Sequence, residues 1–156
     1  MNVRKNPKIE FAEQFGIFFE KVGFPRMAGR VWGYLLTCNP PEQTAEELSK
    51  AVQASRSSVS TMTRLLIQLG LLERVGIPGR RSGYYRVRSG GFTEILRAKM
   101  RFTTEVRRIA EHGLKLLKSE PPSVRKHLEE YRDLCIFFEK QFPMLIEKWE
   151  RGRKKK

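Results

Sequence analysis

The chain has 156 residues, 40% of them hydrophobic and 31% charged, which is enough for the core of one ordinary domain but not of two. No run approaches eighteen apolar residues and the N-terminus lacks the pattern of a signal peptide, so we expect a cytoplasmic protein that does not span a membrane. Cys38 and Cys135 are too few and too far apart for a disulfide framework or a zinc site, and we expect neither a metal nor a cofactor.

The formal net charge of +14 is concentrated in one internal segment. Residues 53–90 contain seven arginines and a single acidic residue, Glu73, whereas residues 1–52 and 91–150 are nearly neutral. A block of one sign can neutralise phosphates and release their condensed counterions, which favours a polyanionic partner. The run at 151–156 is a second basic excess, and we expect it to form a disordered tail.

Two helices are predicted before residue 40. Apolar positions between residues 8 and 23 form two adjacent stripes, which predicts a helix buried on a wide face. A second helix is predicted over 25–37, because proline suits the first helical turn. Its small residues Gly29 and Gly33 permit close contact between helices, and Asn39-Pro40-Pro41 ends it.

The next two predicted helices form a helix-turn-helix. Thr44 and Glu47 have the spacing of a capping box and open a short helix over 45–52. After a break, Ser55 can cap a second helix that ends near Leu69. This second helix has an apolar stripe of Val59, Met62, Leu66 and Leu69 and a polar stripe of Ser57, Thr61, Arg64 and Gln68. A helix with a Ser/Thr/Arg outer face after a tight break is typical of one that enters the major groove.

A β-hairpin is predicted directly after the helix-turn-helix. Residues 71–75 and 84–88 are β-prone, and the loop 76–83 between them contains glycines and a proline. Its tip carries Arg80 and Arg81, which suit a minor-groove or phosphate contact. These features indicate a wing.

Two long helices are predicted at the C-terminal end, over 92–117 and 123–149, with Pro121-Pro122 between them. Their apolar positions exceed what a small winged unit can cover, and an identical chain is the simplest partner. We therefore predict a mainly α fold with a small β-hairpin wing: a winged helix-turn-helix domain over 1–90, a helical dimerisation region over 91–150, and the basic tail.

Three segments carry a family resemblance: "GFPRMAGRVWGYLL", "TAEELSKAVQASRSSVSTMTRLLIQLGLLERV" and the "GIPGRR" loop. They resemble the GbsR-type branch of the MarR superfamily of bacterial and archaeal transcriptional regulators over about residues 9–90. The resemblance implies a recognition helix after the break, an arginine-bearing wing, a dimer built from the terminal helices, and a regulator that is often ligand-responsive. The wing departs from many relatives, because Ser82 and Gly83 follow Arg81 where an acidic residue often occurs.

We therefore expect a homodimeric regulator, a repressor, that reads an inverted repeat in double-stranded DNA. The residues to which the resemblance assigns DNA contact are Ser55, Arg56, Ser57, Ser58, Ser60, Thr61, Arg64, Arg80 and Arg81. Aromatic residues outside this segment have two open interpretations, plain core packing or contact with a small apolar or cationic effector. The effector candidates are Trp32, Tyr34, Phe92, Phe102 and Phe138.

Two other function classes are disfavoured by the residues. Catalysis is not expected, because His112 and His127 are the only histidines and there is no nucleophile elbow, P-loop or dinucleotide fingerprint. The alternative is a winged-helix module that binds protein or RNA instead of an operator. The basic block over 53–90 disfavours a protein partner. RNA-binding modules usually expose aromatics on which bases stack, and the only aromatics of this block, Tyr84 and Tyr85, are explained by the wing strand.

Overall fold

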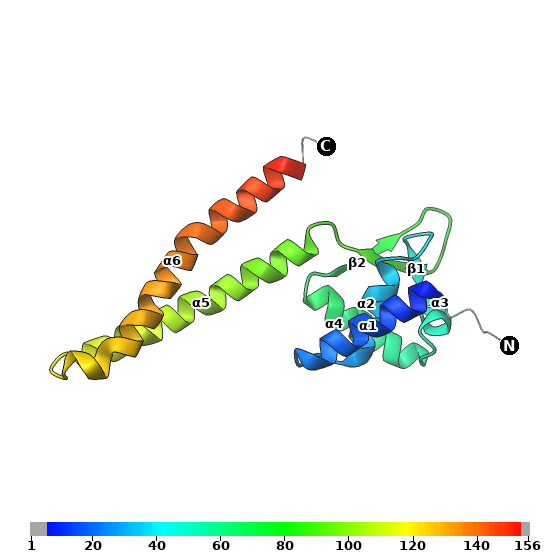
Figure 1. Cartoon of the computed structure of the whole chain (residues 1–156). Helices are drawn as coiled ribbons and strands as arrows, with labels where there is room; N and C mark the ends of the chain where they lie inside the picture. The colour runs from blue at the N-terminus through cyan, green and yellow to red at the C-terminus, as the bar shows by residue number, and fades with distance from the viewer. Residues whose placement is uncertain (1–5, 154–156) are drawn as a thin grey trace. The chain divides into compact units, whose positions relative to one another are not determined.

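The computed structural model describes residues 6–153, and the chain divides into two compact units between Phe92 and Thr93. The architecture is mainly helical, with a small antiparallel sheet and two long C-terminal helices (Figure 1). This confirms the predicted fold class, and each unit is described separately below.

The first unit begins with two helices that pack closely against each other, α1 (Pro7–Lys21) and α2 (Arg26–Leu35). The Asn6 side chain caps α1 by accepting a hydrogen bond from the Lys8 N–H at 3.1 Å. The two backbones nearly touch at Gly29, where an added Cβ would collide with the carbonyl oxygen of Phe15. This confirms that the small residues of the second helix permit close helix contact.

The helix-turn-helix consists of α3 (Ala45–Ala51) and α4 (Arg56–Gln68), and both start where local signals predict. Thr44 and Glu47 form the capping box, with the Glu47 N–H donating to Thr44 Oγ1 at 3.2 Å and the Thr44 N–H donating to Glu47 Oε2 at 2.6 Å. Ser55 caps α4 by accepting from the Ser58 N–H at 3.1 Å. Helix α4 packs against both α2 and α3.

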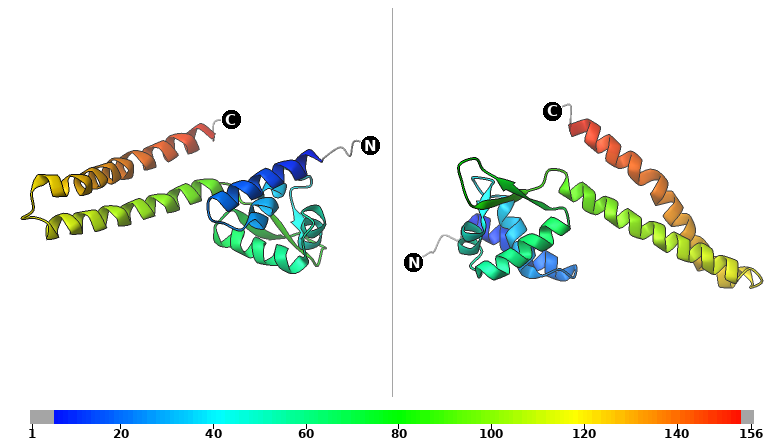
Figure 2. Two further views of the ribbon diagram at one scale, coloured as in Figure 1. Left: turned by 60° about the horizontal axis from the view of Figure 1, so that its bottom comes forward. Right: turned by 180° about the vertical axis from the view of Figure 1, so that it is seen from behind.

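The sheet has three strands in the order β1-β3-β2, all antiparallel: β1 (Gln43–Thr44), β2 (Leu72–Gly76) and β3 (Gly83–Val87). The hairpin β2-β3 is the predicted wing. Strand β1 is not among the predicted elements, and it pairs Gln43 with Tyr85 and Thr44 with Tyr84. The loop between β2 and β3 projects at the same end of the unit as α3 (Figures 1 and 2).

The core of the first unit lies between α2, α3, α4 and the hairpin, with the buried side chains Val31, Leu48, Val59, Leu66, Leu71 and Leu72. The predicted apolar stripe of α4 is only partly correct. Val59 and Leu66 are fully buried, but Met62 and Leu69 are half-buried, and Thr63 takes a buried position outside the predicted stripe. Its hydroxyl is satisfied by donating to the carbonyl of Ser60 at 3.1 Å.

The second unit contains most of α5 (Gly91–Leu116) and all of α6 (Pro122–Arg153). The chain reverses between them, and the two helices form a long antiparallel hairpin (Figure 2). Ion pairs connect them, from Arg107 to Glu139 at 2.9 Å and from Arg97 to Glu150 at 2.7 Å. Helix α6 continues through residues 151–153, so the expectation of disorder is wrong for that part of the tail, and residues 154–156 lie outside the described residues.

Apolar burial within the second unit is sparse. Among residues 93–153, the buried hydrophobic side chains are Ala110, Cys135 and Ile146. Twelve large hydrophobic side chains of this unit are exposed, including Ile109 at 70%. In residues 6–153, no helix combines the length and apolarity needed to cross a bilayer.

Candidate nucleic-acid interface

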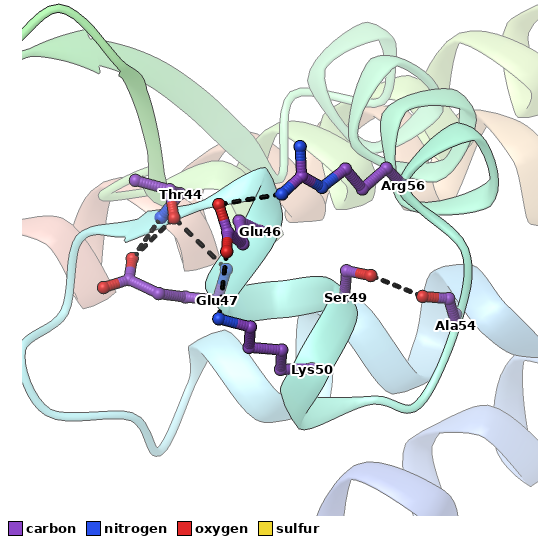
Figure 3. Close-up of polar contacts among 7 residues, drawn as sticks. All are labelled: Thr44, Glu46, Glu47, Ser49, Lys50, Ala54 and Arg56. Atoms are coloured by element: carbon purple, nitrogen blue, oxygen red, sulfur yellow. Dashed lines mark hydrogen bonds and ion pairs between the residues drawn. The ribbon is translucent and has the colours of Figure 1, made fainter.

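The turn between α3 and α4 is held by local backbone contacts. Gln53 adopts a left-handed conformation with φ of 51°, which lets the chain reverse within a few residues. The Ser49 hydroxyl donates across the turn to the carbonyl of Ala54 at 2.5 Å (Figure 3). These contacts set the direction in which α4 leaves α3.

One face of α4 is open to solvent. The polar stripe predicted from the sequence is exposed along its whole length, at Ser57, Thr61, Arg64 and Gln68. The Thr61 hydroxyl donates to the carbonyl of Ser57 at 3.0 Å, which leaves its oxygen available as an acceptor. This face presents hydroxyl, amide and guanidinium groups, which are the groups that read base edges in a major groove.

The other candidate residues of α4 differ in accessibility. Ser55 is exposed, and its hydroxyl is engaged as the helix cap. Ser58 and Ser60 are half-buried, and they flank a residue that packs in the core. Arg56, the first residue of α4, is exposed and projects toward α3 (Figure 3).

Arg56 is paired with an acid of the preceding helix. Its Nη2 lies 2.9 Å from Glu46 Oε2, and the Lys50 Nζ lies 2.9 Å from Glu46 Oε1, so a single carboxylate holds two cations (Figure 3). The hydrogen bond and charge of Lys50, together with the charge of Arg56, lower the pKa of Glu46 below its usual value. Glu46 therefore remains ionised at neutral pH.

The wing carries its arginines in two different arrangements. Arg80 Nη1 donates to the hydroxyl of Tyr84 at 3.3 Å, and Tyr84 is itself buried in the hairpin. Arg81 is exposed. Arg86, in contrast, points to acids, with its Nε at 2.6 Å from Glu73 and its Nη1 at 3.5 Å from Glu42. These ion pairs raise the pKa of Arg86, the hydrogen bond to Glu73 contributing most.

The arginines of the basic block thus divide into paired and unpaired groups. Within residues 6–153, Arg56 and Arg86 have acidic partners, whereas Arg64, Arg74, Arg80, Arg81 and Arg88 have none. The surface of α4 and the tip of the wing therefore keep uncompensated positive charge, as an interface for phosphates requires. The described residues contain no group of three or more potential metal ligands.

The aromatic effector candidates are not brought together as one set. Within the first unit, an open apolar groove of about 590 Å³ is lined by Gln14, Phe15, Phe18, Trp32, Leu36 and Phe92. Trp32 and Phe92 are thus in the groove, whereas Tyr34 is not one of its lining residues. Phe102 and Phe138 belong to the second unit, where both side chains are exposed.

Several site residues are not identified by the sequence patterns. The sequence identifies Tyr84 only as a strand residue and Glu46 only as a polar residue of the first helix of the helix-turn-helix. A signal for Tyr84 exists in its place four residues after Arg80, across the hairpin loop. The sequence does not identify Phe15 and Leu36 as lining the groove. The groove depends on how α1 packs on α2, and no local sequence pattern shows that packing.

The fold and this interface define a winged helix-turn-helix protein with long C-terminal helices. A family model described as "MmpR5-like MarR family transcriptional regulator" matches residues 90–152. The curated relative "HTH-type transcriptional regulator MmpR5" of Mycobacterium tuberculosis (strain ATCC 25618 / H37Rv) is 40% identical over 131 residues, which cover 84% of this chain and 79% of the relative. A solved structure described as "Crystal Structure of a transcriptional regulator" is 36% identical, with a TM-score of 0.74 over 93% of this chain and 99% of the other.

The chain therefore belongs to the MmpR5-like MarR family of transcriptional regulators. This confirms the MarR resemblance at the level of the superfamily.

Proposed function

We propose that this regulator is a homodimeric repressor that binds an inverted repeat in double-stranded DNA through α4 and the β2-β3 wing, and that it acts by binding alone, without catalysis. The observation that carries the proposal is the distribution of arginines. Arg64 on α4 and Arg80 and Arg81 on the wing are exposed and lack acidic partners within residues 6–153, whereas Arg56 and Arg86 of the same block are paired with acids. Uncompensated guanidinium groups at these places suit guanine edges and phosphates.

The dimer is supported by the exposed apolar side chains of the second unit. On α5 they recur every seven residues at Phe102, Ile109 and Leu116, and on α6 they recur in the same way at Val124, Tyr131, Phe138 and Leu145. Seven residues are almost two helical turns, so each series follows one side of its helix. Two such lines suit burial against a second copy, because continuous rows of exposed large apolar side chains are uncommon on monomers. In this proposal Phe102 and Phe138 are dimer residues rather than effector contacts.

A small apolar effector that releases the repressor is the second part of the proposal. The groove beside Trp32 and Phe92 has an almost wholly apolar lining. The indole N–H of Trp32 is buried and has no hydrogen-bond partner among the described residues, which favours an effector that carries an acceptor as well as apolar surface. Such a ligand would change DNA affinity only by the difference between its affinities for the free and the DNA-bound protein.

The assignment to the GbsR-type branch, a narrower group than the MarR family, stays a prediction.

The test is selection of bound fragments from the source genome, followed by footprinting of the enriched sites. We expect protected inverted repeats with half-sites about one helical turn apart. Titrations against matched duplex DNA and RNA over a salt series would separate this function from the alternative, a winged-helix module for protein or RNA. Equal affinity for the two nucleic acids, or enrichment of no common sequence, would contradict the proposal.

A further inference from the structure

Arg56 stands apart from the other exposed arginines of the proposed interface because its guanidinium already has an anionic partner. That partner, Glu46, lies on α3, and the contact of 2.9 Å joins the two helices of the helix-turn-helix (Figure 3). The pair lies on the surface, with the Arg56 side chain 71% and the Glu46 side chain 50% exposed. A surface ion pair of this kind is weak and solvent-accessible, so another anion can replace one partner at small cost.

The position of the pair matters because Arg56 is the first residue of α4. The first turn of α4 contains no acidic residue, and the free N–H groups of a helix N-terminus attract anions. Carboxylates and phosphates both accept hydrogen bonds from a guanidinium in similar, planar arrangements. Glu46 thus supplies, from the neighbouring helix, the same kind of partner that a DNA phosphate would supply.

The carboxylate is also held in place by a second cation. Lys50 lies one turn further along α3, and its ammonium group contacts the oxygen of Glu46 that Arg56 leaves free. Arg56 can therefore leave while Glu46 keeps a charged partner, which lowers the cost of exchanging Glu46 for a phosphate.

We propose that Glu46 is a positioning residue that acts as an internal competitor of DNA phosphate for Arg56, and that it thereby lowers the affinity of the protein for every duplex. This inference rests on the proposed DNA-binding function. On binding, Arg56 exchanges the carboxylate for a phosphate, so the affinity gained from that phosphate is reduced by the cost of breaking the ion pair. Because the exchange involves no base edge, it lowers affinity for operator and unrelated sequences by a similar factor.

The test uses the full chain and the substitutions Glu46→Gln, Arg56→Gln and both together, titrated with an operator duplex and a scrambled duplex of equal length. Glu46→Gln should tighten binding to both duplexes about two- to fivefold at low salt, and this gain should shrink as salt rises. Arg56→Gln should weaken both, and it should reduce the slope of log affinity against log salt by about 0.9, which corresponds to one phosphate. In the Arg56→Gln background, Glu46→Gln should have no effect.

The matched control is Glu10→Gln, which removes one negative charge from the first turn of α1, on a side chain with no ion pair among residues 6–153. It should leave both affinities unchanged. Thermal unfolding of each variant is measured so that titrations are made on folded protein. Weaker or unchanged binding by Glu46→Gln, or a gain that persists without Arg56, would overturn this inference alone. A parent protein that binds no duplex would overturn the proposed function and this inference together.

Discussion

The Nη1 of Arg80 donates a hydrogen bond to the hydroxyl of Tyr84 at 3.3 Å, so a neutral side chain of strand β3 orients an arginine at the tip of the wing. Tyr84 is only 7% exposed and belongs to the buried core of the first unit. A phenol holds the guanidinium without neutralising it, whereas a carboxylate would reduce the charge available to DNA. This arrangement explains how Arg80 can be oriented although no acidic residue follows the arginines in the wing loop.

Tyr84→Phe should therefore weaken binding without unfolding the hairpin. The ring remains, but Arg80 loses its anchor and must be ordered by the DNA at a cost of about 0.5–1.5 kcal/mol. Fluorescence anisotropy with operator and scrambled duplexes would measure an equal loss on both. Tyr85→Phe removes a hydroxyl from the next residue of the same strand and is the control. An effect of Tyr84→Phe that is as large in an Arg80→Ala background would refute the explanation.

Arg64→Ala should act differently, because Arg64 lies on the exposed face of α4. We expect a loss of about 1–3 kcal/mol on the operator and relaxed discrimination at one base pair of each half-site. Arg81→Ala should instead weaken all duplexes to a similar degree, as removal of a phosphate contact does. Titration against a set of single-base operator variants distinguishes the two patterns. If Arg64→Ala left the ranking of these variants unchanged, Arg64 would not read a base.

Ile109→Glu tests the dimer. Ile109 occupies the middle of the exposed apolar line on α5, and a carboxylate buried in an interface there would lack a partner. Sedimentation velocity at micromolar concentration should show a dimer for the parent and a monomer for the variant, with weak operator binding by the latter. Lys99→Glu places the same charge at an exposed polar position of α5 as the control. A monomeric parent would contradict the proposed assembly.

Gly29→Ala should destabilise the first unit. A Cβ at this position meets the carbonyl oxygen and carbon of Phe15 and the Cα of Gly16, all of them backbone atoms that cannot rotate away. The helices α1 and α2 would have to separate, and overpacking of this kind costs about 1–3 kcal/mol or more. Denaturant unfolding followed by circular dichroism measures the change. Gly152→Ala, where the added methyl group meets nothing within 4 Å, should be neutral or slightly stabilising.

The pH dependence of stability should show the contribution of Glu46. Because its folded pKa lies below the ordinary value of 4.5, the carboxylate contributes stability that is present above the unfolded pKa. This contribution is lost as the pH falls through the lowered folded pKa. The difference in free energy of unfolding between the parent and Glu46→Gln should thus be constant from neutral pH to about pH 5 and shrink only in more acidic solution. A difference that changed between about pH 7 and about pH 6 would contradict the assignment.

Much of the first unit could be predicted because its boundaries are marked by local chemistry. The capping box at Thr44 and the cap at Ser55 act over three residues, so sequence spacing is enough to locate α3 and α4. Strand β1 could not be found in this way. It is two residues long, and its existence depends on pairing with Tyr84 and Tyr85, which lie far along the chain.

The site was predicted less completely than the fold, because a side chain's partners depend on tertiary contacts. Residue type and helical position correctly placed Arg64 on an exposed face, but they could not show that Arg56 is paired with Glu46 or that Arg80 is anchored by Tyr84. From residue type alone, the aromatic effector candidates form one set. The structure divides them between two units and joins Trp32 to residues of α1 instead.

Strand β1 has a mechanical consequence for the reading of DNA. Thr44 is both the last residue of β1, paired with Tyr84 of the wing, and the residue that caps α3. Thr44 therefore links the helix-turn-helix to the wing and restricts their movement relative to each other. If the proposed dimer and effector exist, we expect the effector to change the separation or tilt of the two DNA-binding units more than the angle between helix and wing within one unit. In the proposed function, α4 and the wing would therefore leave a half-site together when the protein is released from DNA.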